Sequence, residues 1–240
     1  MASALQVRGA AVSGLTSLSA ALRPHGLMPR GGVHFPDGEG GPRLPGGKTA
    51  RTVVLVGHAG GAMWQAFCDW RATMPADLAD PLDTWSKAVI GPIAAAFGAF
   101  PYYPSDPPYQ PFQRWAIAAE GLAASPLGIL AHPRYGLWHG YRAALGFAED
   151  FSDIETEEVP RAPVCESCRE KPCLTACPAG AITAAGFDVT ACRRHLASEE
   201  GRTCLEEGCL ARAACPVGRD YTYPADQIRF HMAALSLPAL

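Results

Sequence analysis

Eight of the nine cysteines lie in the last third of the 240-residue chain, at spacings that could hold metal. The first set has spacers of two, four and three residues, the second set is looser, and each set ends in a Cys-Pro pair. Thiolate sulfur is a soft ligand, so four such residues could complete a metal centre. The two sets are Cys165, Cys168, Cys173 and Cys177, and then Cys192, Cys204, Cys209 and Cys215.

The first set resembles the C-x2-C-x2-C-x3-C-P run of two-cluster bacterial ferredoxins, although its middle spacer, residues 169–172, is two residues longer. In those proteins the fourth cysteine of each run ligates the other cluster. The resemblance therefore implies two [4Fe–4S] clusters with exchanged fourth ligands. One cluster would use Cys165, Cys168, Cys173 and Cys215, and the other Cys192, Cys204, Cys209 and Cys177.

Zinc and disulfides are the alternatives for these cysteines. Zinc sites usually show two C-x2-C pairs or a mixture of Cys and His, whereas this chain has one C-x2-C pair, and His195 is the one histidine among the cysteines. Disulfides need an oxidising compartment, and the N-terminus shows neither a secretory signal nor twin arginines. Cys68 lies far from both sets in sequence, so we expect it to be a buried, inert thiol.

Charge and hydropathy narrow the classes of partner. The net charge of −3 gives no basic footprint for nucleic acid. The chain has no run of 18 apolar residues, so we expect no membrane span. The sequence thus favours a cytoplasmic protein that binds neither nucleic acid nor membrane.

The periodicity of the chain predicts a mixture of helices and strands. A continuous β-branched run at residues 52–56 predicts a buried strand, and a shorter strand is expected near 33–35. Six acidic residues between 149 and 158 precede two prolines and predict a linker. We therefore expect two domains, residues 1–158 and 159–240. Helices are expected at residues 4–22, from about 62, at 80–97, 112–124 and 227–235, with a strand, a turn and a strand over 125–142.

The helix at 80–97 has the clearest sequence signals. Asp80 is placed to cap its N-terminus, and Pro81 suits the first helical position. Apolar residues then recur at helical spacing and predict a core-facing stripe, before Gly98 ends the helix. The stripe consists of Leu82, Trp85, Val89, Ile93 and Phe97.

Two segments upstream of the cysteines resemble CblC-type cobalamin-processing proteins. His132-Pro133-Arg134-Tyr135-Gly136-Leu137-Trp138 with Arg142 is similar to the H-P-R-F-G-G-W…R segment of that family, and residues 80–83, Asp-Pro-Leu-Asp, are similar to its D-P-V-D segment. Epoxyqueuosine reductases carry a related segment and continue into a two-cluster ferredoxin domain, and reductive dehalogenases also join a corrinoid domain to two clusters. The resemblance implies an α+β fold, with a nitroreductase-like corrinoid-binding domain followed by a small bacterial two-cluster ferredoxin-like domain.

The same resemblance implies roles for individual residues. Arg142 matches a family arginine on the thiol-substrate side of the corrinoid and is the candidate catalytic residue. Candidate corrinoid contacts are His132, Tyr135, Gly136 and Trp138. Trp138 and Tyr141 could pack against the corrin ring. A surface role for Arg142 and a core role for Trp138 and Tyr141 are the structural alternatives.

Together these patterns predict a corrinoid-dependent redox protein whose clusters pass electrons to base-off cobalamin. The expected reaction is reductive processing of cobalamin, by removal of its upper ligand or reduction of cob(II)alamin. The expected partners are cobalamin or another corrinoid and a low-potential electron donor such as ferredoxin or flavodoxin. Two alternatives stay open: a cobalamin-dependent reductase of a separate small organic substrate, and a ferredoxin-type electron carrier whose first domain is a docking module.

Overall fold

The computed structural model describes residues 14–151 and 163–236, which form two compact units. The first unit contains residues 14–58, 62–121 and 140–151, and the second contains 59–61, 122–139 and 163–236. The expected domain boundary at residue 158 lies outside the described residues. Residues 122–139 belong by their contacts to the unit that carries the eight cysteines, although they precede the acidic segment in sequence.

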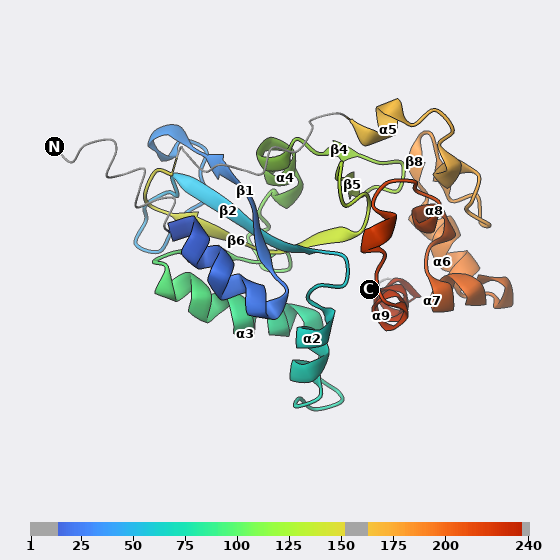
Figure 1. The fold of residues 1–240 in the computed structure, drawn as a ribbon, viewed down its shortest axis with the longest axis horizontal. Coiled ribbons are helices and arrows are strands. Elements are labelled where there is room, and N and C mark those ends of the chain that lie inside the picture. Colours follow the sequence, from blue (N-terminus) through green and yellow to red (C-terminus); the bar gives the residue numbers. More distant parts are fainter. Residues whose placement is uncertain (1–13, 152–162, 237–240) are drawn as a thin grey trace. The chain divides into compact units, whose positions relative to one another are not determined.

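A four-stranded sheet with the order β1-β2-β6-β3 is the centre of the first unit (Figure 1). Its longest strands are β2 (Thr52–Ala59) and β6 (His139–Phe147), while β1 (Met28–His34) and β3 (Phe100–Tyr102) are the outer strands. Every residue of β2 is buried, as a continuous run of β-branched residues predicts. β1 pairs antiparallel with β2, and β3 pairs antiparallel with β6. The strand expected near residues 33–35 is thus longer and begins at Met28.

Four helices accompany this sheet. A helix over residues 14–22 ends at Leu22, and the expected start of this helix lies outside the described residues. The other three are α2 (Trp64–Arg71), α3 (Pro81–Ala96) and α4 (Phe112–Glu120). The helix expected at 112–124 ends earlier because Gly121 adopts a left-handed conformation with φ of 65°. Residues 123–124 then form β4 (Ala123–Ala124), which pairs with β5 (Leu130–Ala131).

The expected stripe on α3 is partly wrong. Leu82 and Trp85 are buried as predicted, but Ile90 and Ala94 are the buried residues of the later turns, whereas Val89 and Ile93 are half-buried. The buried face therefore follows the i, i+4 rows of the helix more closely than the i, i+3 rows. Asp80 precedes the helix as predicted, but its φ is 44° and its side chain makes no capping hydrogen bond.

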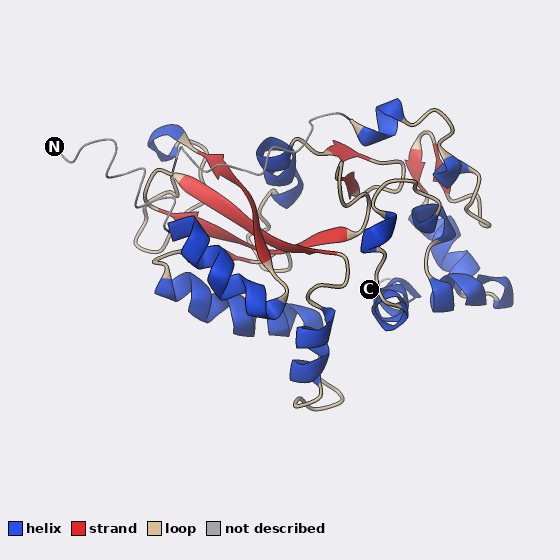
Figure 2. Cartoon of the chain, in the orientation of Figure 1, coloured by secondary structure: helices blue, strands red, loops and turns tan. Residues whose placement is uncertain are grey.

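Short helices dominate the second unit (Figure 2). The longest is α9 (Ala225–Ser236), which includes the helix expected at 227–235. One hairpin joins β7 (Ile182–Thr183) to β8 (Gly186–Phe187), and the Asp188 side chain then caps the next helix by accepting a hydrogen bond from the Ala191 N–H. The remaining helices are α5 (Val164–Ser167), α6 (Val189–Leu196), α7 (Arg202–Glu207) and α8 (Leu210–Ala213).

No described helix combines the length and the apolar composition that a membrane span requires.

A buried ion pair joins α4 to the sheet in the first unit. The Arg30 guanidinium donates two hydrogen bonds to the Glu120 carboxylate, at 2.8 and 3.1 Å, and a third to the His58 carbonyl oxygen at 3.0 Å. The side chains of Arg30 and Glu120 are 2% and 8% exposed. The Tyr141 hydroxyl also donates to Glu120, and burial raises the pKa of Tyr141 far above its usual value. Each buried charge thus has several partners, as burial requires.

Replacing Arg30 with methionine should destabilise the first unit strongly. The substitution leaves the Glu120 carboxylate buried without its cation, which typically costs about 3–5 kcal/mol. The free energy of unfolding from urea denaturation measures this cost. Lys87→Met is the matched control, because its ion pair with Asp106 is solvent-exposed and such pairs contribute about 0–1 kcal/mol. Equal losses in the two variants would contradict a stabilising role for the buried pair.

Candidate metal centres

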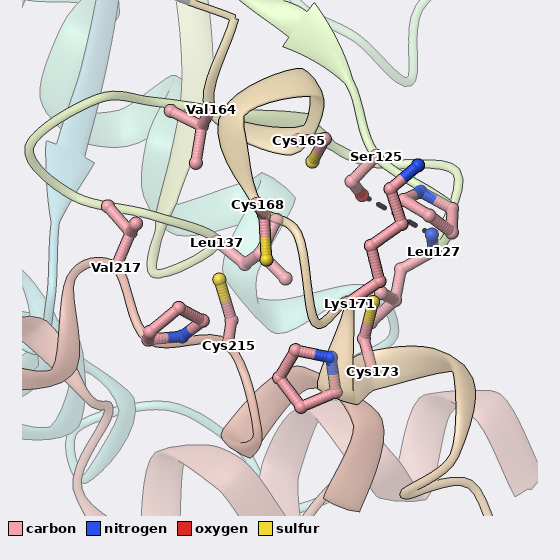
Figure 3. Close-up of a pocket in the computed structure, with 13 residues that line it drawn as sticks. Ser125, Leu127, Leu137, Val164, Cys165, Cys168, Lys171, Cys173, Cys215 and Val217 are labelled. Carbon is pink, nitrogen blue, oxygen red and sulfur yellow. Dashed lines mark hydrogen bonds between the residues drawn. The ribbon is translucent and has the colours of Figure 1, made fainter.

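Four thiols from distant parts of the chain line one cavity of the second unit (Figure 3). Cys165 lies on α5, Cys168 follows this helix, Cys173 lies in the turn Pro172–Leu174, and Cys215 follows α8. The cavity has an empty volume of about 450 Å³, including space open to solvent. Its other walls are mostly apolar and include Leu127, Leu137, Val164 and Val217. We call this group the first thiol set.

The negative charges of neighbouring thiolates affect the pKa values of thiols in this set. Burial raises the pKa of Cys165, and the negative charges of Cys215, Cys173 and Cys168 raise it further, while the Lys171 ammonium lowers it. Burial and the charge of Cys215 likewise raise the pKa of Cys173. Four thiolates at such close quarters need cationic partners, and metal ions provide them.

A second thiol set consists of Cys177, Cys192, Cys204 and Cys209. Burial raises the pKa of Cys192 to about 11, with further contributions from the charges of Cys209, Cys177 and Cys204. The pKa of Cys204 is raised by burial, then by Cys209 and Cys177. Cys177 thus lies in the second thiol set and Cys215 in the first thiol set. These are the groupings that the exchanged ferredoxin pattern implies.

Backbone amides at the start of α8 point to sulfur atoms of the second set. The N–H groups of Arg212 and Ala211 hydrogen-bond the Cys209 sulfur, and the Leu210 N–H hydrogen-bonds the Cys204 sulfur. Because these bonds favour the charged thiolate, they lower the pKa of both thiols, against the larger effect of burial. Hydrogen bonds to ligand sulfur are also among the factors that set the potential of an iron–sulfur cluster.

The donor sets fit cubane clusters in chemistry and number. Each set offers four thiols, and none of the nine cysteines, all of which lie among the described residues, forms a disulfide. A single tetrahedral zinc ion would bring four sulfurs to about 3.8 Å from one another, given a bond of about 2.3 Å. Among the described residues, no three Cys, His, Asp or Glu side chains are gathered in a way that could hold one metal ion. In a [4Fe–4S] cluster each thiolate binds a different iron, so the sulfurs lie farther apart.

Residues 132–138 pack against the chain that follows Cys215. Gly136 has φ of 57°, and a Cβ there would overlap the Val217 carbonyl oxygen. Gly218 has φ of 76°, and a Cβ there would overlap the Tyr135 carbonyl oxygen. Both positions therefore need glycine, which allows the two backbones to touch. We call this pairing the glycine contact.

The side chains predicted to contact a corrinoid are buried in the second unit. His132, Tyr135 and Trp138 are 1%, 6% and 4% exposed. His132 Nδ1 accepts hydrogen bonds from the N–H groups of Arg134 and Tyr135, and its ring stacks on the Tyr135 ring at 4.2 Å. Through these contacts His132 and Tyr135 shape the segment itself. Corrinoid contact by His132, Tyr135, Gly136 and Trp138 stays a prediction.

Arg212 is a functional candidate that the sequence did not lead us to expect. Its Nε and Nη2 both donate to the Leu137 carbonyl oxygen, at 3.1 and 2.6 Å. Its guanidinium carbon lies 4.2 Å from the centroid of the Trp138 ring and 4.6 Å from that of Tyr223. One residue thus bonds the Cys209 sulfur through its backbone and fixes residues 137–138 through its side chain. In the sequence, its position between Cys209 and Cys215 was the feature that could have indicated a role near the thiols.

The structure brings together two segments that carry the CblC resemblance. Arg142 Nη1 lies 3.9 Å from Asp83 Oδ1, which links β6 to the first turn of α3. The side chains are 20% and 41% exposed, so this ion pair is accessible to solvent. Arg142 belongs to the first unit, whereas the four candidate corrinoid contacts belong to the second. The catalytic role of Arg142 stays a prediction.

Comparison with known proteins gives a fold but no family. No family model and no curated protein match the chain. The structure is similar to that of CblC, a B12-trafficking protein of C. elegans and homologue of human MMACHC, with a TM-score of 0.51 and 13% identity over 94% of this chain and 96% of that one. Epoxyqueuosine reductase from Bacillus subtilis also matches, with a TM-score of 0.47 and 12% identity over 92% of this chain and 68% of that one. The mixed α+β class is confirmed with a CblC-like fold, and the ferredoxin-like second domain stays a prediction.

Single cysteine substitutions should show the exchange of the fourth ligands. Cys177→Ser should remove the centre that contains Cys192, and Cys215→Ser the centre that contains Cys165, because the fourth thiol of each centre comes from the other run. After anaerobic reconstitution, about eight irons per chain should fall to about four in each variant. The electron paramagnetic resonance spectrum of reduced Cys177→Ser should then match that of Cys192→Ser, and the spectrum of Cys215→Ser that of Cys165→Ser.

Cys68→Ser is the control, since Cys68 lies on α2 in the first unit, outside both thiol sets. Its iron content and spectrum should equal those of the wild type. A match between Cys177→Ser and Cys165→Ser would show that each run keeps its own fourth cysteine.

Proposed function

We propose that this protein is an oxidoreductase in which two [4Fe–4S] clusters pass electrons to base-off cobalamin. The reaction is reductive processing of cobalamin itself: one electron converts cob(II)alamin to cob(I)alamin, and one electron releases cyanide from cyanocobalamin to leave cob(II)alamin. A low-potential donor, ferredoxin or flavodoxin, supplies the electrons. The protein works in the cytoplasm, and its function involves neither nucleic acid nor membrane.

The observation that carries this proposal is the gathering of eight cysteines into two sets of four thiols. Each set joins residues far apart in sequence, such as Cys165 with Cys215. The clusters, when bound, supply single electrons at potentials down to about −700 mV, a range suited to the strongly reducing cob(I) state. The thiol sets would hold these clusters, and apolar walls such as Leu137 and Val217 would limit water around the first one.

The corrinoid part of the proposal rests on three observations. The fold is similar to that of a B12-trafficking protein. The sequence carries the two CblC-like segments at residues 80–83 and 132–142. In the structure Asp83 and Arg142, one from each segment, lie within ion-pair distance. A solvent-accessible arginine at this position can orient an anionic group, such as a thiolate or the leaving cyanide.

A chain that carries both the electron relay and the corrinoid site has a kinetic advantage. A covalent link keeps the electron relay at a high effective concentration near its acceptor, so that no diffusional encounter is needed for each one-electron step. This advantage matters for a strongly reducing product, which reacts with other oxidants when it is exposed.

The direct test is reduction of cob(II)alamin by the intact protein. Anaerobically reconstituted protein, mixed with cob(II)alamin and reduced flavodoxin, should form cob(I)alamin in stopped-flow absorbance records. Cys173→Ser should abolish this reduction, because it breaks the first thiol set, and a cob(II)alamin titration on the same preparation separates this loss from any loss of corrinoid binding. Cys68→Ser is the matched control and should react like the wild type. Equal rates in wild type and Cys173→Ser would exclude the clusters from the electron path, and absence of corrinoid binding in all variants would favour a plain electron carrier.

Arg142→Ala tests the role proposed for the first unit. Turnover of cyanocobalamin should fall about tenfold, which corresponds to about 1.4 kcal/mol in the barrier, with little change in corrinoid affinity. A binding titration and a rate assay on the same preparation measure both quantities. Arg114→Ala, which changes an exposed arginine on α4, should leave both unchanged. A loss of affinity that accounts for the whole loss of rate would assign Arg142 to binding alone.

A further inference from the structure

The spacer between Cys168 and Cys173 places a cation at the first thiol set. Lys171 lines the cavity together with Cys165, Cys168, Cys173 and Cys215 (Figure 3). The spacer is two residues longer than that of the ferredoxins it resembles, and Lys171 lies within the longer stretch.

The backbone at Lys171 is held in an uncommon conformation. Its φ is 42° and its ψ is 55°, in the left-handed region that residues with a side chain rarely adopt. Pro172 follows and begins the turn Pro172–Leu174, which carries Cys173. A strained residue next to a ligand persists only when the surrounding structure fixes it, and such strain gathers at functional sites. Lys171, whose backbone is strained, is the residue of the spacer that places a cation on the cavity wall.

We propose that Lys171 raises the reduction potential of the cluster bound by the first thiol set. This inference rests on the proposed function, since it requires a cluster at Cys165, Cys168, Cys173 and Cys215. Reduction adds one negative charge to the cluster, and a nearby cation stabilises the charged product by Coulomb attraction. Lys171 therefore makes the first cluster a better electron acceptor. Arg169 and Glu170, its neighbours in the spacer, do not line the cavity.

The test is a potentiometric titration of the reconstituted protein, followed by electron paramagnetic resonance. In Lys171→Met the ratio of reduced to oxidised first cluster at a fixed potential should fall about tenfold, which equals a shift of about 59 mV to lower potential for a one-electron couple. The midpoint of the second cluster should not move, which provides an internal control. Lys171→Arg keeps the charge and should keep the wild-type midpoint.

Two further variants separate charge from local structure. Arg169→Met removes an exposed cation from the same spacer and should leave both midpoints unchanged. Lys171→Asn removes the charge but retains a residue that tolerates the left-handed conformation, so it should shift the midpoint as Lys171→Met does. Because Lys171 is exposed, the difference from the wild type should shrink as ionic strength rises.

The outcomes distinguish this inference from the function on which it rests. Full iron content with an unshifted first midpoint in Lys171→Met and Lys171→Asn would overturn the role of Lys171 and leave the clusters in place. A shift of the same size in Arg169→Met or Lys171→Arg would also overturn it, since the effect would then not depend on a charge at this position. Absence of iron in the wild type after reconstitution would instead overturn the proposed function.

Discussion

The glycine contact between Gly136 and Gly218 is the constraint on which the second unit depends. Two backbone segments touch there, and each would collide with a Cβ on the other. The contact joins residues 132–138 to the chain that follows Cys215. Leu137 thereby becomes a wall of the first thiol set, and its carbonyl oxygen accepts two hydrogen bonds from Arg212. The segment that resembles a corrinoid-binding motif is therefore part of the framework around the first thiol set.

Charge is the second constraint on this unit. Each thiol set gathers groups that repel one another once they ionise. Burial raises the pKa of Cys165 and Cys192, and the charges of neighbouring thiolates raise both values further. The chain offsets part of this cost with backbone N–H donors at Cys204 and Cys209 and with the cation of Lys171. Bound metal would offset the rest, so metal binding and folding of the second unit are expected to be coupled.

The first unit contains one buried ion pair and one ion pair that is accessible to solvent. Arg30 and Glu120 are buried, hydrogen-bonded to each other and committed to holding α4 on the sheet. Arg142 and Asp83 form a longer ion pair that solvent reaches. An arginine with an accessible head can exchange its partner for a ligand, whereas Arg30 cannot without leaving a buried carboxylate unpaired. This difference is the reason to propose chemistry for Arg142 and a stabilising role for Arg30.

The sequence by itself determined the features that depend on short-range patterns. The β-branched run at 52–56 predicted a buried strand, Pro81 marked the start of α3, and the spacing of the cysteines divided them into two sets. A resemblance to ferredoxins also implied the exchange of Cys177 and Cys215, which the grouping in the structure matches. Tertiary structure decided what depends on distant partners. It moved the buried face of α3 to Ile90 and Ala94, and it assigned residues 122–139 to the cysteine-bearing unit. It also placed Arg212 against Leu137 and Trp138, and Lys171 on the wall of the first thiol set, because folding decides which side chains meet.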